Sequence, residues 1–110
     1  MVNKITDDTV DGILDTESKL TIIQFSAEWC GPCKMSSPIL DNLSNENGDV
    51  SFNKIDVDVS GDNQKSPQLA AKYGVRGIPT VVFIVDGEEK ERTVGMKSQS
   101  DLQIIIDSLK

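Results

Sequence analysis

One short segment decides how this chain is interpreted: Trp29-Cys30-Gly31-Pro32-Cys33-Lys34. Cys30 and Cys33 are the only cysteines, and the chain contains no histidine. Two cysteines separated by two residues at the start of a helix lie close enough to form and break a disulfide bond. A thiol pair without an imidazole beside it indicates electron exchange more than hydrolysis.

The position of each cysteine relative to the predicted helix over 32–45 assigns it a role. Cys30 lies just before that helix, where unpaired N–H groups and the positive end of the helix dipole favour a thiolate. Cys33 falls one turn inside and is expected to be less accessible. We therefore predict that Cys30 is the nucleophile and Cys33 the resolving thiol. Gly31, which lets the backbone approach closely, and Pro32, which stiffens the turn, are expected to tune the couple.

The alternative to a redox pair is a metal or haem site. A closed zinc site needs about four nitrogen or sulfur ligands, and two cysteines without histidine do not supply them. A c-type haem site has histidine after the second cysteine, where this chain has Lys34. The chain also has no Gly-x-Gly-x-x-Gly element. We therefore expect no bound metal and no nucleotide cofactor.

Helix and strand signals alternate along the 110 residues, which predicts a single α/β domain spanning 1–110. Four strands are expected, the last two joined by an Asp86-Gly87 hairpin: 20–26, 50–57, 80–85 and 89–94. Four helices are expected: one capped by Thr6 with a stripe of Val10, Ile13 and Leu14; 32–45 with a kink at Pro38; 67–73; and one capped by Ser98 with a stripe of Leu102, Ile105, Ile106 and Leu109.

The composition is acidic, with 18 acidic against 11 basic residues and a formal net charge of −7. This balance argues against a nucleic-acid partner, which requires a basic face. No apolar run approaches the roughly 20 residues of a membrane span, and the N-terminus lacks the apolar core of a signal peptide. We therefore expect a cytoplasmic protein with no membrane association. In that compartment a Cys-x-x-Cys pair is more often redox-active or metal-binding than structural.

The sequence resembles the thioredoxin family over essentially its whole length. Besides the cysteine motif, the matching positions are Phe25, Ala27-Glu28, Pro38, Lys54 within Lys-Ile-Asp-Val-Asp, the run Ala70-Ala71-Lys72-Tyr73-Gly74-Val75-Arg76-Gly77-Ile78-Pro79-Thr80, and Val94-Gly95. The resemblance implies the thioredoxin fold, a central five-stranded mixed β-sheet flanked by four α-helices.

The resemblance also implies a substrate-binding surface around Cys30. It implies that the Ile78–Pro79 peptide bond is cis, faces the cysteines and offers backbone groups to an extended substrate. The residues implied to bind substrate beside Gly31 and Pro32 are Trp29, Gly77, Ile78, Pro79, Gly95 and Met96. Simple packing is the alternative role for each of them.

The chain departs from the family pattern at Gln24, where the family usually has a buried aspartate that helps to move the proton of the second cysteine. A glutamine forms hydrogen bonds but takes up no proton near neutral pH. We hypothesise that Lys54 and water assist proton transfer at Cys33, with Gln24 as a neutral hydrogen-bond partner. The alternative is that Lys54 merely extends its stem along an apolar face. Elsewhere, Ser26 leaves Trp29 as the only tryptophan, and the loop over 59–66 is longer than usual.

Together these features predict a monomeric protein-disulfide reductase. The resemblance implies disulfide-containing protein substrates and a thioredoxin reductase, driven by NADPH or ferredoxin, as partners. One alternative is an oxidase or isomerase of the same fold, which the Gly31-Pro32 dipeptide disfavours. The other is a structural subunit of a larger complex in which the cysteines are dispensable.

Overall fold

The computed structural model describes residues 2–5, 20–27, 30–56, 73–75 and 77–109, of which 2–5 and 56 are described by their backbone alone. The strands are β1 Val2–Ile5, β2 Thr21–Ser26, β3 Ser51–Asp56, β4 Thr80–Val85 and β5 Glu88–Val94; the helices are α2 Gly31–Glu46 and α4 Gln99–Leu109. The predicted helix after Thr6, the loop over 59–66 and all of the predicted helix over 67–73 except Tyr73 lie outside the described residues.

The strands form one mixed sheet in the order β1-β3-β2-β4-β5. β2 runs parallel to β3 and antiparallel to β4, and β5 returns antiparallel to β4. Every residue of β2 is buried. Ile22 packs toward α2 and α4, whereas Ile23 and Phe25 pack on the opposite face. β2 thus agrees with the buried strand that the sequence predicted over 20–26.

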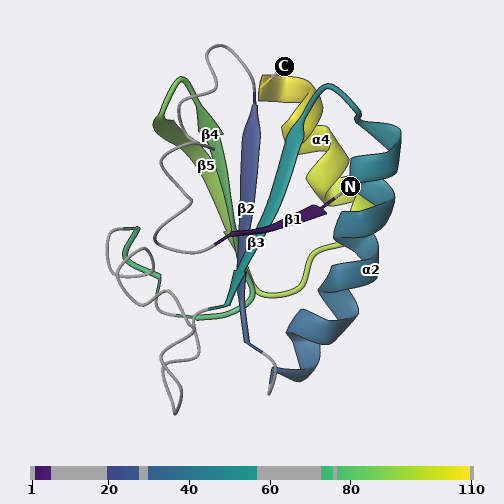
Figure 1. The fold of residues 1–110 in the computed structure, drawn as a ribbon, viewed down its shortest axis with the longest axis vertical. Coiled ribbons are helices and arrows are strands. Elements are labelled where there is room, and N and C mark those ends of the chain that lie inside the picture. Colours follow the sequence, from purple (N-terminus) through teal and green to yellow (C-terminus); the bar gives the residue numbers. More distant parts are fainter. Residues whose placement is uncertain (1, 6–19, 28–29, 57–72, 76, 110) are drawn as a thin grey trace.

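The helices α2 and α4 lie together on one side of the sheet (Figure 1). Leu40 and Leu43 of α2 share a buried cluster with Leu102 and Ile106 of α4. Ile105 and Leu109, the other members of the predicted stripe, are partly buried against the same cluster. Pro38 lies inside α2 as predicted. Neither described helix is long and apolar enough to cross a membrane.

The strand register brings three chain segments to one end of the sheet. Phe25, near the end of β2, pairs with Thr80 at the start of β4. Thr80 also pairs with Val94 at the end of β5. The segments that precede β4 and follow β5 therefore meet the start of α2, which carries the cysteines.

Candidate active site

The cysteine pair is built into the first turn of α2. Cys30 is the N-cap residue, with extended backbone angles (φ −85°, ψ 111°), and its Sγ accepts a hydrogen bond of 3.2 Å from the N–H of Cys33. The two cysteines are joined by a disulfide, with Cα atoms 5.2 Å apart. Cys30 is 5% exposed and Cys33 only 2%. Both cysteines are therefore nearly buried in the disulfide form, and Cys33 is slightly the less exposed of the two.

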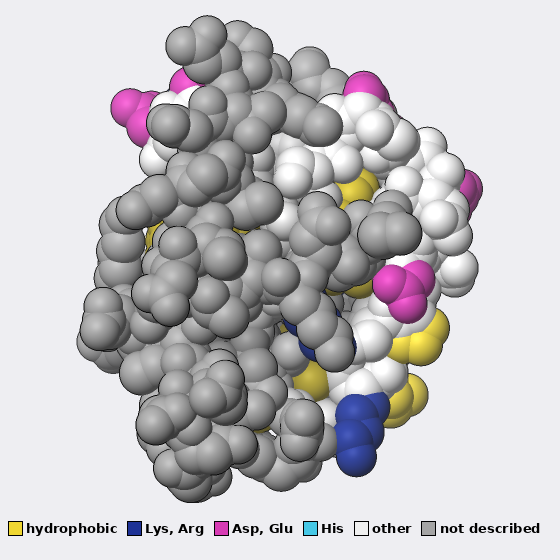
Figure 2. Space-filling model, in the orientation of Figure 1, with side chains coloured by type: hydrophobic (Ala, Val, Ile, Leu, Met, Phe, Trp, Pro, Cys, Tyr) yellow, Lys and Arg dark blue, Asp and Glu magenta, His cyan; other side chains and the backbone are white. Residues whose placement is uncertain are grey.

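The start of α2 carries a basic residue and no acidic one among the described residues. The first turn of α2 contains no acidic residue, and Lys34 is exposed at its edge. An anion at a helix N-terminus is stabilised by the unpaired N–H groups and by the helix dipole. Figure 2 shows basic and hydrophobic side chains exposed over the lower end of α2, with acidic side chains higher up. The methionine that follows, Met35, is 60% exposed.

The turn before β4 forms the wall opposite the cysteines. The carbonyl oxygen of Ile78 lies 3.9 Å from Cys30 Sγ, and its side chain packs against Ala27, Cys30 and Cys33. The Ile78–Pro79 peptide bond is cis, and Pro79 is buried. The structure therefore brings this turn against the cysteine pair, although 48 residues separate Cys30 from Ile78.

The chain after β5 is fixed to the same turn. The N–H of Gly95 donates a hydrogen bond of 2.8 Å to the carbonyl of Pro79, and Gly95 has a positive φ of 86°. Met96 is 44% exposed beside it. On the other side of Pro79, the Thr80 hydroxyl donates to the carbonyl of Gly77.

Val94 lies beside Gly77 and was not among the predicted binding residues. It is 56% exposed, and its Cγ1 lies 3.5 Å from where a Cβ on Gly77 would be. The signal in the sequence is its position: it follows a run of charged residues in β5 and precedes a glycine.

The described structure does not test the roles expected of Gly31, Pro32 and Trp29. Gly31 was expected to allow close backbone approach, and a Cβ built there would meet no described atom within 4 Å. Gly31 and Pro32 are both exposed, so neither is required by packing within the described part of the chain. Trp29 lies outside the described residues.

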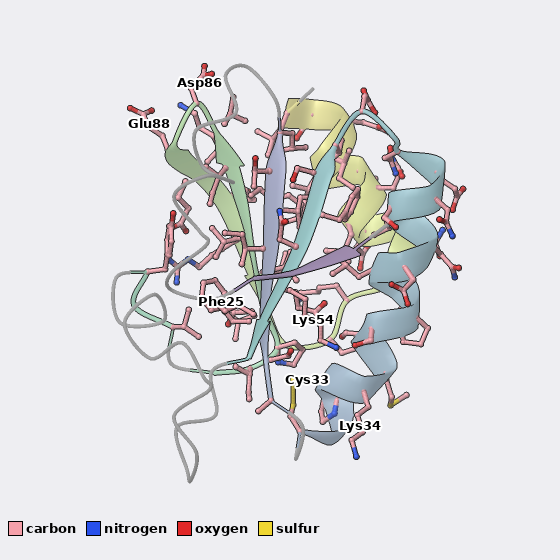
Figure 3. All side chains as sticks on the ribbon, viewed as in Figure 1. Phe25, Cys33, Lys34, Lys54, Asp86 and Glu88 are labelled. Atoms are coloured by element: carbon pink, nitrogen blue, oxygen red, sulfur yellow. A yellow bond between two sulfur atoms is a disulfide. The ribbon has the colours of Figure 1, made fainter. Side chains whose placement is uncertain are left out.

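Gln24 and Lys54 are neighbours on adjacent strands but do not form the expected contact. They are paired in register between β2 and β3. Gln24 is 1% exposed, and its Nε2 has no hydrogen-bond partner among the described residues. Lys54 instead reaches α2, where its Nζ donates a 3.0 Å hydrogen bond to Ser37 Oγ (Figure 3).

Ser37 also lies at this site and was not identified by the sequence analysis. Its hydroxyl donates a 3.2 Å hydrogen bond to the carbonyl of Cys33 while accepting from Lys54. The available signal was helical spacing, because Ser37 follows Cys33 by four residues and so lies on the same face. A serine hydroxyl in a helix commonly bonds to the carbonyl four residues earlier.

No cluster of three or more histidine, cysteine, aspartate or glutamate side chains that could hold a metal ion occurs in the described ranges. What the site does offer is a disulfide at a helix N-terminus, packed against the turn that contains Ile78 and Pro79. A dithiol of this kind exchanges electrons with another disulfide through a mixed disulfide. The fold and the site together define a thiol–disulfide oxidoreductase.

Comparison with known proteins identifies the family. The family model for thioredoxin matches residues 1–108. A thioredoxin of Chlamydia trachomatis is 45% identical over 85 residues, covering 77% of this chain and 78% of its own. Thioredoxins of Staphylococcus epidermidis and Rickettsia felis are 37% and 34% identical, each over at least 92% of both chains. The chain belongs to the thioredoxin family. It is a protein-disulfide oxidoreductase that works through the Cys30–Cys33 dithiol and disulfide.

Proposed function

We propose that the chain reduces protein disulfides in two steps with distinct roles for its cysteines. The Cys30 thiolate attacks a substrate disulfide, forming a Cys30–substrate bond and releasing the other substrate sulfur as a thiolate. The Cys33 thiol then loses its proton to solvent, and its sulfur attacks Cys30 Sγ. The Cys30–substrate bond breaks, the second substrate sulfur leaves with the electron pair, and the Cys30–Cys33 disulfide remains. The N-cap position of Cys30 and the deeper burial of Cys33 support this order.

Substrate binds, in this proposal, as an extended segment against the turn that contains the cis peptide bond. Main-chain groups of such a segment pair with an exposed backbone edge in the manner of an added strand. The proposed binding residues are those around Cys30: Trp29, Gly31, Pro32, Gly77, Ile78, Pro79, Gly95 and Met96. The 3.9 Å approach of the Ile78 carbonyl to Cys30 Sγ is the observation that carries the proposal, because a backbone acceptor beside the attacking sulfur aligns a bound peptide.

Lys54 and Gln24 are proposed to act at Cys33 rather than on substrate. The Lys54 ammonium, held at the Cys33 turn through Ser37, favours the loss of the Cys33 proton to water. Gln24 lies opposite Lys54 in the register and is buried without adding a charge to this site.

The wider context follows from the family. We infer a single thioredoxin domain over 1–110, with a five-stranded sheet and four helices in the complete chain. It acts as a cytoplasmic monomer that binds neither nucleic acid nor membranes and carries no bound cofactor. Its electrons come from a thioredoxin reductase that uses NADPH or ferredoxin.

The test is reduction of insulin disulfides with NADPH and thioredoxin reductase, with a parallel assay using ferredoxin and its reductase. Wild-type protein is expected to sustain many turnovers with one of the two donors. Cys30→Ser is expected to abolish turnover in both. Turnover by Cys30→Ser, or its absence in wild type with a chemical reductant such as dithiothreitol, would contradict the proposal.

A further inference from the structure

A continuous set of hydrogen bonds links the sheet to the cysteine turn. Lys54 of β3 donates to Ser37 Oγ at 3.0 Å, and Ser37 donates to the carbonyl of Cys33 at 3.2 Å. Both Lys54 and Ser37 are partly buried. Figure 3 shows the Lys54 side chain reaching from β3 toward α2 above Cys33. The ammonium is thus attached, through one hydroxyl, to the residue that resolves the mixed disulfide.

The Ser37 hydroxyl links Lys54 to Cys33 because it acts as a donor and as an acceptor at the same time. Its single proton goes to the Cys33 carbonyl, which orients the oxygen lone pairs for the Lys54 donor. Gln24, the residue paired with Lys54 across the strands, is neutral. Ser37 is therefore the side chain that fixes the Lys54 ammonium among the contacts of the described residues.

We propose that Ser37 is a positioning residue for the resolving step: it holds the Lys54 ammonium at the first turns of α2, where negative charge develops on Cys33. This inference rests on the proposed roles of Cys30 and Cys33. A long lysine side chain samples many conformations when it is free. A charge fixed in place before the reaction stabilises a developing anion without reorganisation at the moment of attack.

The attack by Cys30 and the attack by Cys33 each release one coloured product, so the rates of the two steps can be measured separately. Reduced protein is mixed with dithiobis-nitrobenzoate. Attack by the Cys30 thiolate cleaves the reagent disulfide and releases one coloured nitrothiobenzoate. Attack by Cys33 on the mixed disulfide then breaks the Cys30–reagent bond, releases the second nitrothiobenzoate and leaves the Cys30–Cys33 disulfide.

Ser37→Ala is expected to slow the second release by about threefold to tenfold, in the range that coupled neighbours show. The first release is expected to change by less than about twofold, because Cys30 has its own stabilising contacts at the N-cap. Ser37→Thr retains the hydroxyl and is expected to restore the second rate. In a Lys54→Met background, Ser37→Ala is expected to add no further slowing.

Ser44→Ala is the matched control. Ser44 lies in the same helix and also donates to a backbone carbonyl, that of Asp41 at 2.8 Å, at the end of α2 remote from the cysteines. It is expected to leave both rates unchanged. Thermal unfolding of the oxidised proteins checks that all variants fold.

Three results would overturn the inference while leaving the proposed function intact: an unchanged second rate in Ser37→Ala, equal slowing by Ser44→Ala, or undiminished slowing in the Lys54→Met background. Failure of the proposed function has a different signature. In that case Cys33→Ser would still release two nitrothiobenzoates, or Cys30→Ser would still give the fast first release.

Discussion

Cys30 Sγ and the carbonyl oxygen of Ile78 lie 3.9 Å apart, which joins the start of α2 to the turn before β4. The strand register brings these two atoms together, because Phe25, near the end of β2, pairs with Thr80, which follows the turn directly. A substrate peptide bound along the turn would present its disulfide to the outer cysteine. In the disulfide form both sulfur-bearing residues are nearly buried, Cys33 at 2% exposure and Cys30 at 5%.

Cys33→Ser is therefore expected to trap substrates on Cys30. The attack by Cys30 remains, but the mixed disulfide is not resolved. Incubation with reducible insulin, followed by non-reducing electrophoresis and mass spectrometry, should give a covalent adduct at Cys30. The matched Cys30→Ser variant should give none. An adduct formed through Cys33 in preference to Cys30 would reverse the assigned roles.

Introducing the acid that the family usually carries, by Gln24→Asp, is expected to slow the resolving step at neutral pH. Position 24 is buried and paired in register with Lys54, and a carboxylate beside that ammonium would offset the charge that favours a Cys33 thiolate. The pH at which the second nitrothiobenzoate release reaches half its maximal rate is expected to rise by about one unit. An unchanged pH profile would show that position 24 does not act on Cys33.

Gln24→Met is the control for that change because it keeps the length of the side chain without a carboxylate. It is expected to leave the pH profile unchanged. Its free energy of unfolding is expected to stay the same or rise by about 1 kcal/mol, because Gln24 Nε2 has no hydrogen-bond partner among the described residues. Urea unfolding measures this difference. A clear loss of stability in Gln24→Met would contradict the absence of a hydrogen-bond partner for Gln24 Nε2.

Gly95→Ala is expected to destabilise the protein by about 1 kcal/mol, because a residue with a side chain adopts the left-handed region at a cost. Gly95 has φ 86°, yet a Cβ there would meet no described atom within 4 Å. The cost is therefore conformational. Gly48→Ala, at an equally open position without a positive φ, is the matched control and should lose less stability in urea unfolding. Equal losses in the two variants would contradict this account.

The phenol of Tyr73 is expected to ionise above pH 10. Burial first, and then the Glu89 carboxylate, raise the pKa of Tyr73 from 10.0. The folded chain then keeps a proton that the unfolded chain loses, so this contribution to stability is complete below pH 10 and is lost as pH rises through the folded pKa. Tyr73 is the only tyrosine, so its ultraviolet absorbance reports the titration alone.

A matched pair of substitutions in β5 tests whether the Glu89 carboxylate raises the pKa of Tyr73. Glu89→Gln is expected to lower the Tyr73 midpoint, since it removes the nearby carboxylate. Glu88→Gln, which removes an exposed carboxylate paired with Lys90, is expected to leave it unchanged. A midpoint at or below 10.0 in the wild-type protein would contradict the assigned burial.

Much of the described fold could be predicted from local signals. The run from Thr80 to Val85 is apolar enough to indicate a strand covered on both faces, and its predicted bounds are those observed. The Asp86-Gly87 pair predicted a hairpin, and both residues have the positive φ values, 53° and 81°, that such a turn requires. The local sequence was sufficient here because the residues of the turn and of the strand determine these two elements without distant partners.

Features that depend on distant partners were harder to predict. β1 was not predicted from its residues, because Val-Asn-Lys-Ile is short and its two apolar positions do not alternate; its position comes from pairing with β3. The Lys54–Ser37 contact was missed for a similar reason, since it depends on how α2 sits over β3. A pair of reciprocal amide hydrogen bonds between Asn47 and Gln103 likewise joins segments 56 residues apart.

The equilibrium reduction potential of the Cys30–Cys33 couple tests the central claim most directly. It can be read from Trp29 fluorescence in glutathione or dithiothreitol buffers, because Trp29 is the only tryptophan and is adjacent in sequence to Cys30. A protein-disulfide reductase of this family is expected near about −270 mV, the value typical of thioredoxin. A potential near about −120 mV, typical of an oxidase with a Cys-x-x-Cys site, would contradict the assignment as a reductant.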